Sequence, residues 1–597
     1  MRTVTTRSTG PAPSESGAER MPMASLANPA LAVAGPSGRA RFLARVPRGL
    51  TVLLTAAAVL APLSLIVYQS LLSAPFFDAT KKAGLDAYRF IFADPDFWTA
   101  LRNSLSIAAV MTVIAVPLGA VLAFVMERTD FPGKRWIEPA ILVPSFVSPM
   151  VLAFGYVVAA GPVGFYSVWS NDLFGAAPWG LYSILAMATV AGLTHVPNVY
   201  IYASAALKNL GSDVEEAARV AGASPLRVAV SVSLPLIMPA LLFSAVLIFF
   251  LGLELFGLPL VLGDPEGHLV LSTYLYKLTN KLGTPSYHLM AAVAVCIIAL
   301  TVPLVLMQRR LLQNVRKYAT VKGKAGRIRE LPLGRWRWPA FALIALWIFV
   351  SVIVPLSGIA LRAFVTNWGV GVNLRDVLTL DSFRAVFGEP TDIAAIRNTV
   401  LIGVVGGAIT VACYTAIGFA THRRNDFLSR VIDYLVLTPR AVPGLLIGLA
   451  FLWVFLFFPP LRPLRQTLIS MWLAYSVVWL AYGMRLISTS LMQVSSELEE
   501  AGRTVGASRG RVSRDITMPL IRYGLLGSWL LVFMIFEREY STGVYLLGPG
   551  TEVLGAELVS LWQGGAIDVV AALSLINIVL VFIGLAIALR FGVKLRD

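Results

Sequence analysis

Acidic side chains are scarce in this chain, with 33 among 597 residues, and two of them open a pattern that occurs twice. In each copy a glutamate is followed by two small residues, then by a glycine and a proline at fixed spacings. The first copy comprises Glu216, Ala217, Ala218, Gly222 and Pro235. The second begins 284 residues later and comprises Glu500, Ala501, Gly502, Gly506 and Pro519. The small side chains let another surface approach closely. No cluster of His, Asp or Glu has metal-ligand or acid–base spacing, so we expect no catalytic or metal site.

Each copy is predicted to fold as two short helices joined by a turn. A serine three residues before a glutamate predicts a capping box at the start of the first helix. The glycine ends that helix with a positive φ, and a serine two residues later caps the next helix. These roles fall to Ser212, Glu215, Gly222 and Ser224 in the first copy, and to Ser496, Glu499, Gly506 and Ser508 in the second.

The repeated pattern resembles the cytoplasmic coupling loop of permeases in bacterial ABC importers. That resemblance implies that each loop docks one subunit of an ATPase dimer, and that two permease halves are fused in one polypeptide. It also implies a solute-binding protein on the outer side of the membrane. The chain has no phosphate-binding motif of the type G-x4-G-K-[S/T]. We therefore expect ATP hydrolysis on a separate partner, and expect the chain itself to be a transport subunit without enzymatic activity or cofactor.

The composition predicts an all-α protein that crosses a membrane many times. Mean hydropathy is +0.75, 57% of residues are hydrophobic and 14% are charged. A bilayer requires roughly 20 apolar residues per helix. About twelve stretches meet this requirement, six in each half: 50–73, 102–126, 138–160, 181–207, 236–262, 287–308, 339–362, 398–420, 432–458, 467–491, 521–547 and 569–590.

The distribution of basic residues predicts the orientation in the membrane. The net charge of +16 is concentrated before the first span, between the sixth and seventh spans, and after the last. Because basic loops favour the cytoplasm, we expect both termini and the central linker inside, in a bacterial inner membrane, and residues 161–180 and 264–286 outside. This location of the charge argues against nucleic-acid binding. The short outer loop with Arg462 and Arg465 goes against the rule.

Matching features in both halves indicate an internal duplication. Corresponding Pro, Asn and Asp residues near the first three spans lie 293 to 296 residues apart, and a shorter outer loop changes the offset to 284. An even number of spans per half gives parallel repeats, for which a pseudo-two-fold axis along the membrane normal is expected. The predicted divisions are a disordered tail at 1–48, a first permease domain at 49–312, a basic linker at 313–336 and a second permease domain at 337–597.

Two acidic residues in apolar spans are candidate pathway residues, because charges in a membrane are costly. Glu254 and Glu539 each precede a Leu-Gly pair by the same spacing, and we expect them to line the path and to favour a cation. An ion pair that only fixes helix packing is the alternative.

The basic linker and the segment from Arg538 to Leu554 are similar to ferric-iron permeases, so iron is the expected solute. Thiamine, polyamines and aminoethylphosphonate are alternatives carried by related permeases. An ion-coupled secondary transporter is the alternative of another class.

Overall fold

The computed structural model describes residues 38–210, 213–280, 285–318 and 330–590. Within these ranges the regular elements are helices, and β-type pairing is limited to three isolated bridges. Residues 51–597 form one compact unit, and the N-terminal residues up to Leu50 form another. Of the predicted tail, residues 38–48 are helical, whereas residues 1–37 lie outside the described residues. Residues 319–329 of the predicted linker also lie outside them.

Thirteen helices of the described residues precede the linker. They are α1 (Gly38–Ser70), α2 (Asp86–Ala93), α3 (Pro95–Arg128), α4 (Lys134–Phe146), α5 (Pro149–Ala160), α6 (Phe165–Phe174), α7 (Ile184–Asn209), α8 (Asp213–Val220), α9 (Pro225–Val228), α10 (Leu234–Glu254), α11 (Gly257–Leu262), α12 (Leu271–Asn280) and α13 (Tyr287–Tyr318).

Fourteen helices of the described residues follow the linker. They are α14 (Arg337–Ile348), α15 (Val354–Ala363), α16 (Asp381–Gly388), α17 (Pro390–Leu401), α18 (Gly407–Thr421), α19 (Phe427–Leu437), α20 (Gly444–Phe457), α21 (Leu468–Val478), α22 (Leu480–Met492), α23 (Ser496–Thr504), α24 (Arg509–Val512), α25 (Met518–Arg538), α26 (Leu554–Gln563) and α27 (Ile567–Arg590). Short π-helical turns join α14 to α15, α17 to α18, α9 to α10 and α24 to α25.

The described residues contain ten helices long and apolar enough to cross a membrane, or eleven if a bent pair counts as one. The prediction of about twelve uniform spans is therefore corrected in three places. Predicted span 138–160 breaks between α4 and α5, and the qualifying helix runs from Pro149 to Phe174. Predicted span 432–458 is bent by 110° between the segment Phe427–Ala441 and Gly444–Phe457. Predicted span 467–491 divides at Trp479 into α21 and α22.

Proline explains two of these breaks, because it removes a backbone donor and clashes with the preceding turn. Pro149 begins α5, and Pro443 immediately precedes α20. The fifth span also ends earlier than predicted in both copies. α10 stops at Glu254 and α25 stops at Arg538, so the residues that follow form turns and short helices instead of continuing the span.

The first helix of each copy contacts the other copy. Tyr156 of α5 donates from its hydroxyl to the carbonyl of Val350, 2.9 Å away, between α14 and α15. A Cβ on Gly155 would lie 2.5 Å from the carbonyl oxygen of Pro355, so glycine permits this close packing. In the reciprocal contact, the rings of Tyr68 in α1 and Phe457 in α20 lie 6.1 Å apart. The first helix of each copy therefore contacts the third span of the other.

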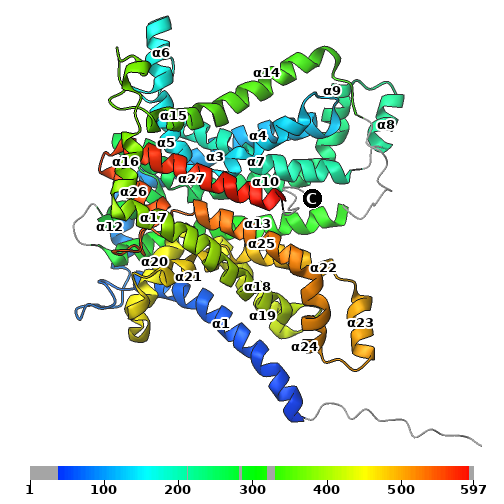
Figure 1. The fold of residues 1–597 in the computed structure, drawn as a ribbon. Coiled ribbons are helices and arrows are strands. Elements are labelled where there is room, and N and C mark those ends of the chain that lie inside the picture. The colour runs from blue at the N-terminus through cyan, green and yellow to red at the C-terminus, as the bar shows by residue number, and fades with distance from the viewer. Residues whose placement is uncertain (1–37, 211–212, 281–284, 319–329, 591–597) are drawn as a thin grey trace, which may run out of the picture. The chain divides into compact units, whose positions relative to one another are not determined.

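The repeat loops lie together at one end of the compact unit. Figure 1 shows α8, α9, α23 and α24 at the right of the view, whereas α12, α16 and α26 lie at the opposite end. The fold thus presents both predicted loops on the same side of the helical bundle.

Candidate functional site: two loop anchors and a central polar cluster

The first repeat loop ends its leading helix in a Schellman turn. Gly222 has a φ of +86°. Its N–H donates to the Arg219 carbonyl at 2.9 Å, and the Ala223 N–H donates to the Ala218 carbonyl at 3.0 Å. Ser224 then accepts from the Arg227 N–H at 3.4 Å. The predicted glycine terminus and serine cap are confirmed here.

The second repeat loop has the same hydrogen bonds. Gly506 has a φ of +84°. The Gly506 N–H donates to the Arg503 carbonyl at 3.0 Å, and the Ala507 N–H donates to the Gly502 carbonyl at 3.1 Å. Ser508 caps α24 by accepting from the Arg511 N–H at 3.4 Å. Because a left-handed φ favours glycine, both loops require it at this position.

The predicted capping box of the second loop is corrected, and that of the first loop stays a prediction. α23 is capped by Ser495, whose hydroxyl accepts from the Glu497 N–H at 3.2 Å, and not by Ser496. Ser212 lies outside the described residues. The carboxylates of Glu215 and Glu499 are both buried, and both bind residues from other elements.

The first loop anchor consists of Glu215, Arg128 and Ser233. The Arg128 Nε lies 3.3 Å from the Glu215 Oε1, and the Ser233 hydroxyl donates to the same oxygen at 2.7 Å. Arg128 is 1% exposed and also donates to the carbonyls of Leu207 and Leu210 at 2.8 and 2.9 Å. This anchor therefore joins α8 to the ends of α3 and α7 and to the start of α10.

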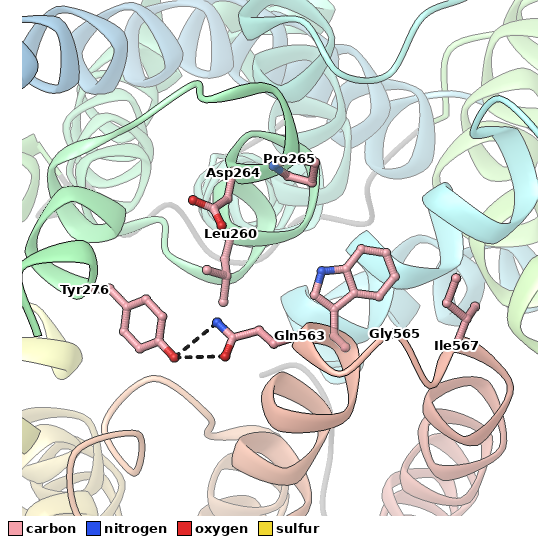
Figure 2. Close-up of a pocket in the computed structure, with 8 residues that line it drawn as sticks. Leu260, Asp264, Pro265, Tyr276, Gln563, Gly565 and Ile567 are labelled. Atoms are coloured by element: carbon pink, nitrogen blue, oxygen red, sulfur yellow. Dashed lines mark hydrogen bonds between the residues drawn. The ribbon is translucent and has the colours of Figure 1, made fainter. Parts of the chain in front are cut away.

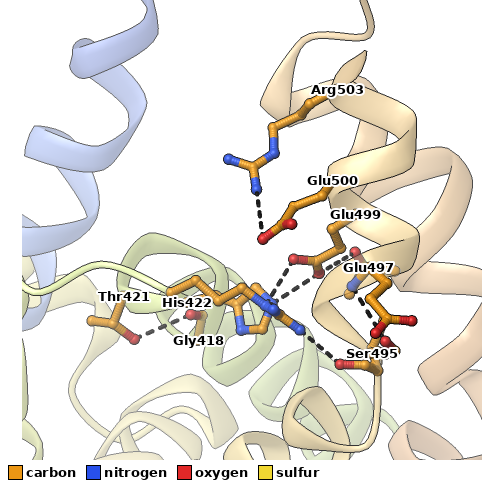
Figure 3. Close-up of polar contacts among 11 residues, drawn as sticks. Gly418, Thr421, His422, Ser495, Glu497, Glu499, Glu500 and Arg503 are labelled. Carbon is orange, nitrogen blue, oxygen red and sulfur yellow. Dashed lines mark hydrogen bonds and ion pairs between the residues drawn. The ribbon is translucent and has the colours of Figure 1, made fainter. Parts of the chain in front are cut away.

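The second loop anchor consists of Glu499, His422, Arg423 and Thr517. Figure 3 labels Glu499 and His422. The Glu499 carboxylate lies 2.9 Å from His422 Nε2 and 2.9 Å from Arg423 Nε, and accepts from the Thr517 hydroxyl at 2.9 Å. Arg423 also donates to the Val494 carbonyl at 2.7 Å. Burial raises the pKa of the Glu499 carboxyl, but hydrogen bonds from His422 and Thr517 and the charge of Arg423 outweigh it and lower the pKa below its ordinary value.

The two anchors use arginines that are not at matching positions. By sequence offset Arg128 corresponds to Arg424, yet the residue that binds Glu499 is Arg423. Arg423 has a φ of +49°, which is uncommon for a residue other than glycine. Sequence reasoning missed both anchors. The available signal was a charged residue directly at the end of each second span, opposite a glutamate that the motif had already singled out.

The motif glutamates themselves are less buried than their neighbours. Glu216 is half-buried, and Glu500 is exposed, with Arg503 one turn away at 4.0 Å (Figure 3). Two apolar side chains project from the loops, since Val220 is 90% exposed and Val505 is 84% exposed. Most of the other motif residues are exposed or half-buried, namely Ala217, Ala218, Gly222, Pro235, Ala501, Gly506 and Pro519. The loops thus offer a small, partly apolar surface.

Gly502 is the buried exception among the motif residues. A Cβ at Gly502 would lie 2.7 Å from the Cδ1 of Ile516. The first copy has Ala218 and Val232 at these two positions. The departure from alanine in the second motif is therefore matched by a larger residue opposite it, which conserves the packed volume.

A central polar cluster contains both candidate pathway residues. Glu254 ends α10, and its Oε1 accepts from the Gly444 N–H at the start of α20, at 2.9 Å. Glu539 follows α25, and its carboxylate accepts from Trp479 at 2.9 Å, from Ser541 at 3.0 Å and from Thr542 at 3.0 and 3.2 Å. The two carboxylates interact electrostatically. The structure thus brings them together.

Arg440 of this cluster was not singled out from the sequence, and Arg538 and Tyr540 add contacts between the two copies. Arg440, between α19 and α20, interacts electrostatically with Glu254, Tyr202 and Arg485. Arg538 donates to the Ser145 carbonyl of the first copy. The Tyr540 hydroxyl accepts from the Gly257 N–H at 3.0 Å, which also joins the two copies. The missed signal was the presence of arginines inside predicted spans.

A pocket of about 480 Å³ lies at the end of the bundle opposite the repeat loops (Figure 2). The first copy contributes Leu260, Asp264, Pro265 and Tyr276, and the second contributes Trp562, Gln563, Gly565 and Ile567. The Tyr276 hydroxyl and the Gln563 side chain lie within 3.4 Å of each other across it. The two copies therefore enclose a pocket at this end.

Comparisons with known proteins agree with this duplicated architecture. The model of the family described as "Binding-protein-dependent transport system inner membrane component" matches residues 115–317 and 408–597. A ferric transport system permease protein, FbpB, of Actinobacillus pleuropneumoniae is 24% identical over 80% of this chain and 69% of its own length. A probable ABC transporter permease of Sinorhizobium fredii, y4fN, is 25% identical over 91% of this chain and 95% of its own length. The molybdenum permease ModB of Escherichia coli is 27% identical over 36% of this chain and 92% of its own length. The chain therefore belongs to the family of inner membrane components of binding-protein-dependent transport systems, and it carries two copies of the family domain.

Proposed function

We propose that this chain forms the complete membrane pathway of an ATP-driven ABC importer, with an ATPase dimer docked on its two repeat loops. The matched Schellman turns carry this proposal, because two loops of the same geometry lie at one end of the bundle. Each loop is tied through its buried glutamate to the second and fifth spans of its copy. Movement of a docked subunit would thereby be transmitted to the spans that line the interface.

The loops, the linker and both termini face the cytoplasm in this proposal. The division into a tail at 1–48, permease domains at 49–312 and 337–597, and a linker at 313–336 belongs to the same proposal. The pocket between the copies then opens outward, where a solute-binding protein would deliver its cargo. Labelling of introduced cysteines with an impermeant reagent in intact cells tests the orientation. Labelling of a cysteine introduced at Glu330, with no labelling of one introduced at Asn171, would show that the orientation is the opposite of the proposed one.

Ferric iron is the proposed solute. Three relatives whose printed names describe ferric transport permeases each align with 76% to 80% of this chain. Glu254 and Glu539 lie where the copies meet, and we propose that they line the path. Their preference for a cation stays part of this proposal. Glu254 accepts a hydrogen bond from Gly444, and Glu539 accepts from Trp479, Ser541 and Thr542.

Uptake of radioactive iron by cells that express the chain with its transport partners tests this function. The expected result is iron accumulation that stops when the ATPase is inactivated. Accumulation that is independent of the ATPase would indicate a secondary transporter. If iron uptake is absent but thiamine, a polyamine or 2-aminoethylphosphonate is taken up in an ATP-dependent way, the assignment of iron as the solute is wrong. The proposed importer function would still stand.

A further inference from the structure

The end of the linker lies against the end of the second span of the first copy. The Leu331 N–H donates to the Arg128 carbonyl at 2.7 Å, and the Asp130 N–H donates to the Leu331 carbonyl at 3.1 Å. These bonds form a short parallel bridge between Thr129 and Leu331. Because Leu331 is only 2% exposed, this part of the linker is packed into the protein. Residues 330–337 are called the linker strap below.

Polar contacts fix both ends of the linker strap. The Glu330 carboxylate lies 2.8 Å from Lys134 Nζ at one end. At the other end, the Asp130 carboxylate accepts from the Leu333 N–H at 2.8 Å and lies 3.2 Å from Arg337 Nη2. Exposed ion pairs contribute little to stability. We therefore expect the hydrogen bond from the Leu333 backbone to Asp130 to be the main polar contact.

The linker strap continues into a helix of the second copy that packs on the first copy. This helix is α14, which begins at Arg337. Near its start, the rings of Phe341 and Phe131 are stacked with their centres 6.4 Å apart. Near its end, the Trp347 indole N–H donates to the Leu193 carbonyl of α7 at 3.2 Å. The strap therefore joins the end of α3 to a helix that contacts the first copy near both of its ends.

The residue that the linker strap binds through its backbone also holds the first repeat loop through its side chain. The Arg128 carbonyl accepts from Leu331, and the Arg128 Nε lies 3.3 Å from the Glu215 Oε1 of α8. Because both contacts belong to one residue, a displacement of the end of α3 would also displace the partner of Glu215. The strap is therefore placed to fix the geometry of the first loop anchor.

The second copy uses the matching aspartate differently. Asp426 corresponds to Asp130 in the repeat. Its carboxylate caps α19 by accepting from the Ser429 N–H at 3.1 Å and from the Ser429 hydroxyl at 2.8 Å. α4 is the counterpart of α19, and it begins after Gly133, which offers no side chain as a cap. The same aspartate thus binds the linker in one copy and caps a helix in the other.

We propose that the linker strap is a positioning element of the first repeat loop. Asp130 and Leu331 set the place of this loop through Arg128 and Glu215. Movement of an ATPase subunit docked there then reaches α14, in the first span of the second copy, as well as the spans of the first copy. This inference rests on the proposed function, because it takes the repeat loops as the docking sites of the ATPase.

Hydrogen exchange of the purified full-length chain in lipid nanodiscs, without the ATPase, tests the position of the loop. Asp130→Ala removes the acceptor of the Leu333 N–H, and Leu331→Ala weakens the same contact from the linker side. Each should speed exchange in α8 about fivefold or more, since local opening becomes easier when such a contact is lost. Exchange in α23 should stay unchanged. Asp130→Asn keeps an acceptor and should lie between Asp130→Ala and the unmodified chain.

Asp426→Ala is the matched control, because it removes the corresponding side chain of the second copy. It should speed exchange at the start of α19, where the cap is lost, and leave α8 unchanged. Unchanged exchange of α8 in both Asp130→Ala and Leu331→Ala would overturn the proposal. An equal increase in α8 and α23 would also overturn it, because the variants would then loosen the whole chain.

Iron uptake and ATP hydrolysis by the complete transporter separate this inference from the proposed function. Asp130→Ala should lose iron uptake per ATP hydrolysed, relative to the unmodified chain. If the unmodified chain takes up iron and Asp130→Ala has the same ratio, the strap does not act on coupling and the proposal is wrong. If exchange in α8 changes as expected but the unmodified chain shows no ATP-driven uptake, the importer function fails and the positioning of the loop by the strap stands.

Discussion

The two loop anchors perform the same task with different residues. In the first, one buried arginine binds Glu215 and the carbonyls at the end of α7. In the second, Arg423 and His422 share Glu499, and Arg423 alone reaches the carbonyl of Val494. Arg128 is 1% exposed, whereas the Arg423 side chain is 32% exposed. The first anchor is thus a single buried pair, and the second is a more open network.

The difference shows which features the duplication has preserved. Both anchors keep a buried glutamate, a hydroxyl at the start of the fifth span and a cation at the end of the second. The position of the cation has moved by one residue, and the left-handed φ of Arg423 accompanies the move. The two copies therefore share the same contacts, although the arginine that makes them does not lie at the matching sequence position.

Removal of the cation should produce the largest difference in stability between the two anchors. Arg128→Met leaves Glu215 buried without a cation, which costs about 3–5 kcal/mol. Arg423→Met leaves Glu499 with His422 and Thr517, and should cost about 1–2 kcal/mol. Apparent Tm values of the purified variants measure the difference. Arg128→Met/Glu215→Met should recover part of the loss, and equal Tm shifts for the two single variants would show that the anchors are equivalent.

Replacement of the turn glycines should affect both loops to a similar degree. Gly222→Val and Gly506→Val force a β-branched residue into a left-handed φ, at about 1–2 kcal/mol each. A Cβ added at either glycine would meet no heavy atom of the described residues within 4 Å. We therefore expect the protein to remain in the membrane while ATP-driven uptake falls. Asn, which tolerates this φ, is the control at each position, and unchanged uptake in both Val variants would argue against a coupling role.

A smaller effect should come from the packing pair of the second loop. Gly502→Ala places a methyl group 2.7 Å from Ile516 and should cost about 1 kcal/mol. Adding Ile516→Val recreates the Ala and Val pair of the first loop and should restore the Tm. If the double variant is less stable than Gly502→Ala alone, the two loops are packed differently.

Acid sensitivity should be a property of the second loop. The pKa of Glu499 is lowered in the folded chain, so its ionised form stabilises the fold above the unfolded pKa. This contribution is lost as the pH falls through the folded pKa. Between about pH 5 and pH 3, the Tm of the unmodified chain should fall more steeply than that of Glu499→Gln. Parallel pH profiles would contradict this assignment.

The sequence allowed the repeat, the helical membrane fold and the loop turns to be predicted, because each depends on local patterns. Gly222 and Gly506 show this, since a glycine between two short helices was enough to predict a positive φ at that position. The anchors and the central cluster could not be predicted, because they join segments far apart in sequence. Arg128 meets Glu215 only after three spans have packed, and the shift to Arg423 leaves no trace in the motif. The span count differed from the prediction for a related reason, since apolar composition does not report where a helix bends.

Site-specific crosslinking tests the central claim most directly. Val220→Cys and Val505→Cys place a thiol on the most exposed apolar position of each loop, in a chain that lacks Cys296 and Cys413. Crosslinking in membranes that contain the complete transporter should join both positions to the same ATPase subunit type. The yield at each position should change when ATP is bound. Crosslinks at Ala74 and Val370, placed on the other side of the membrane as controls, should be absent. A crosslink to the ATPase from neither loop, or from one loop alone, would contradict the account that both loops transmit ATPase movement to the path.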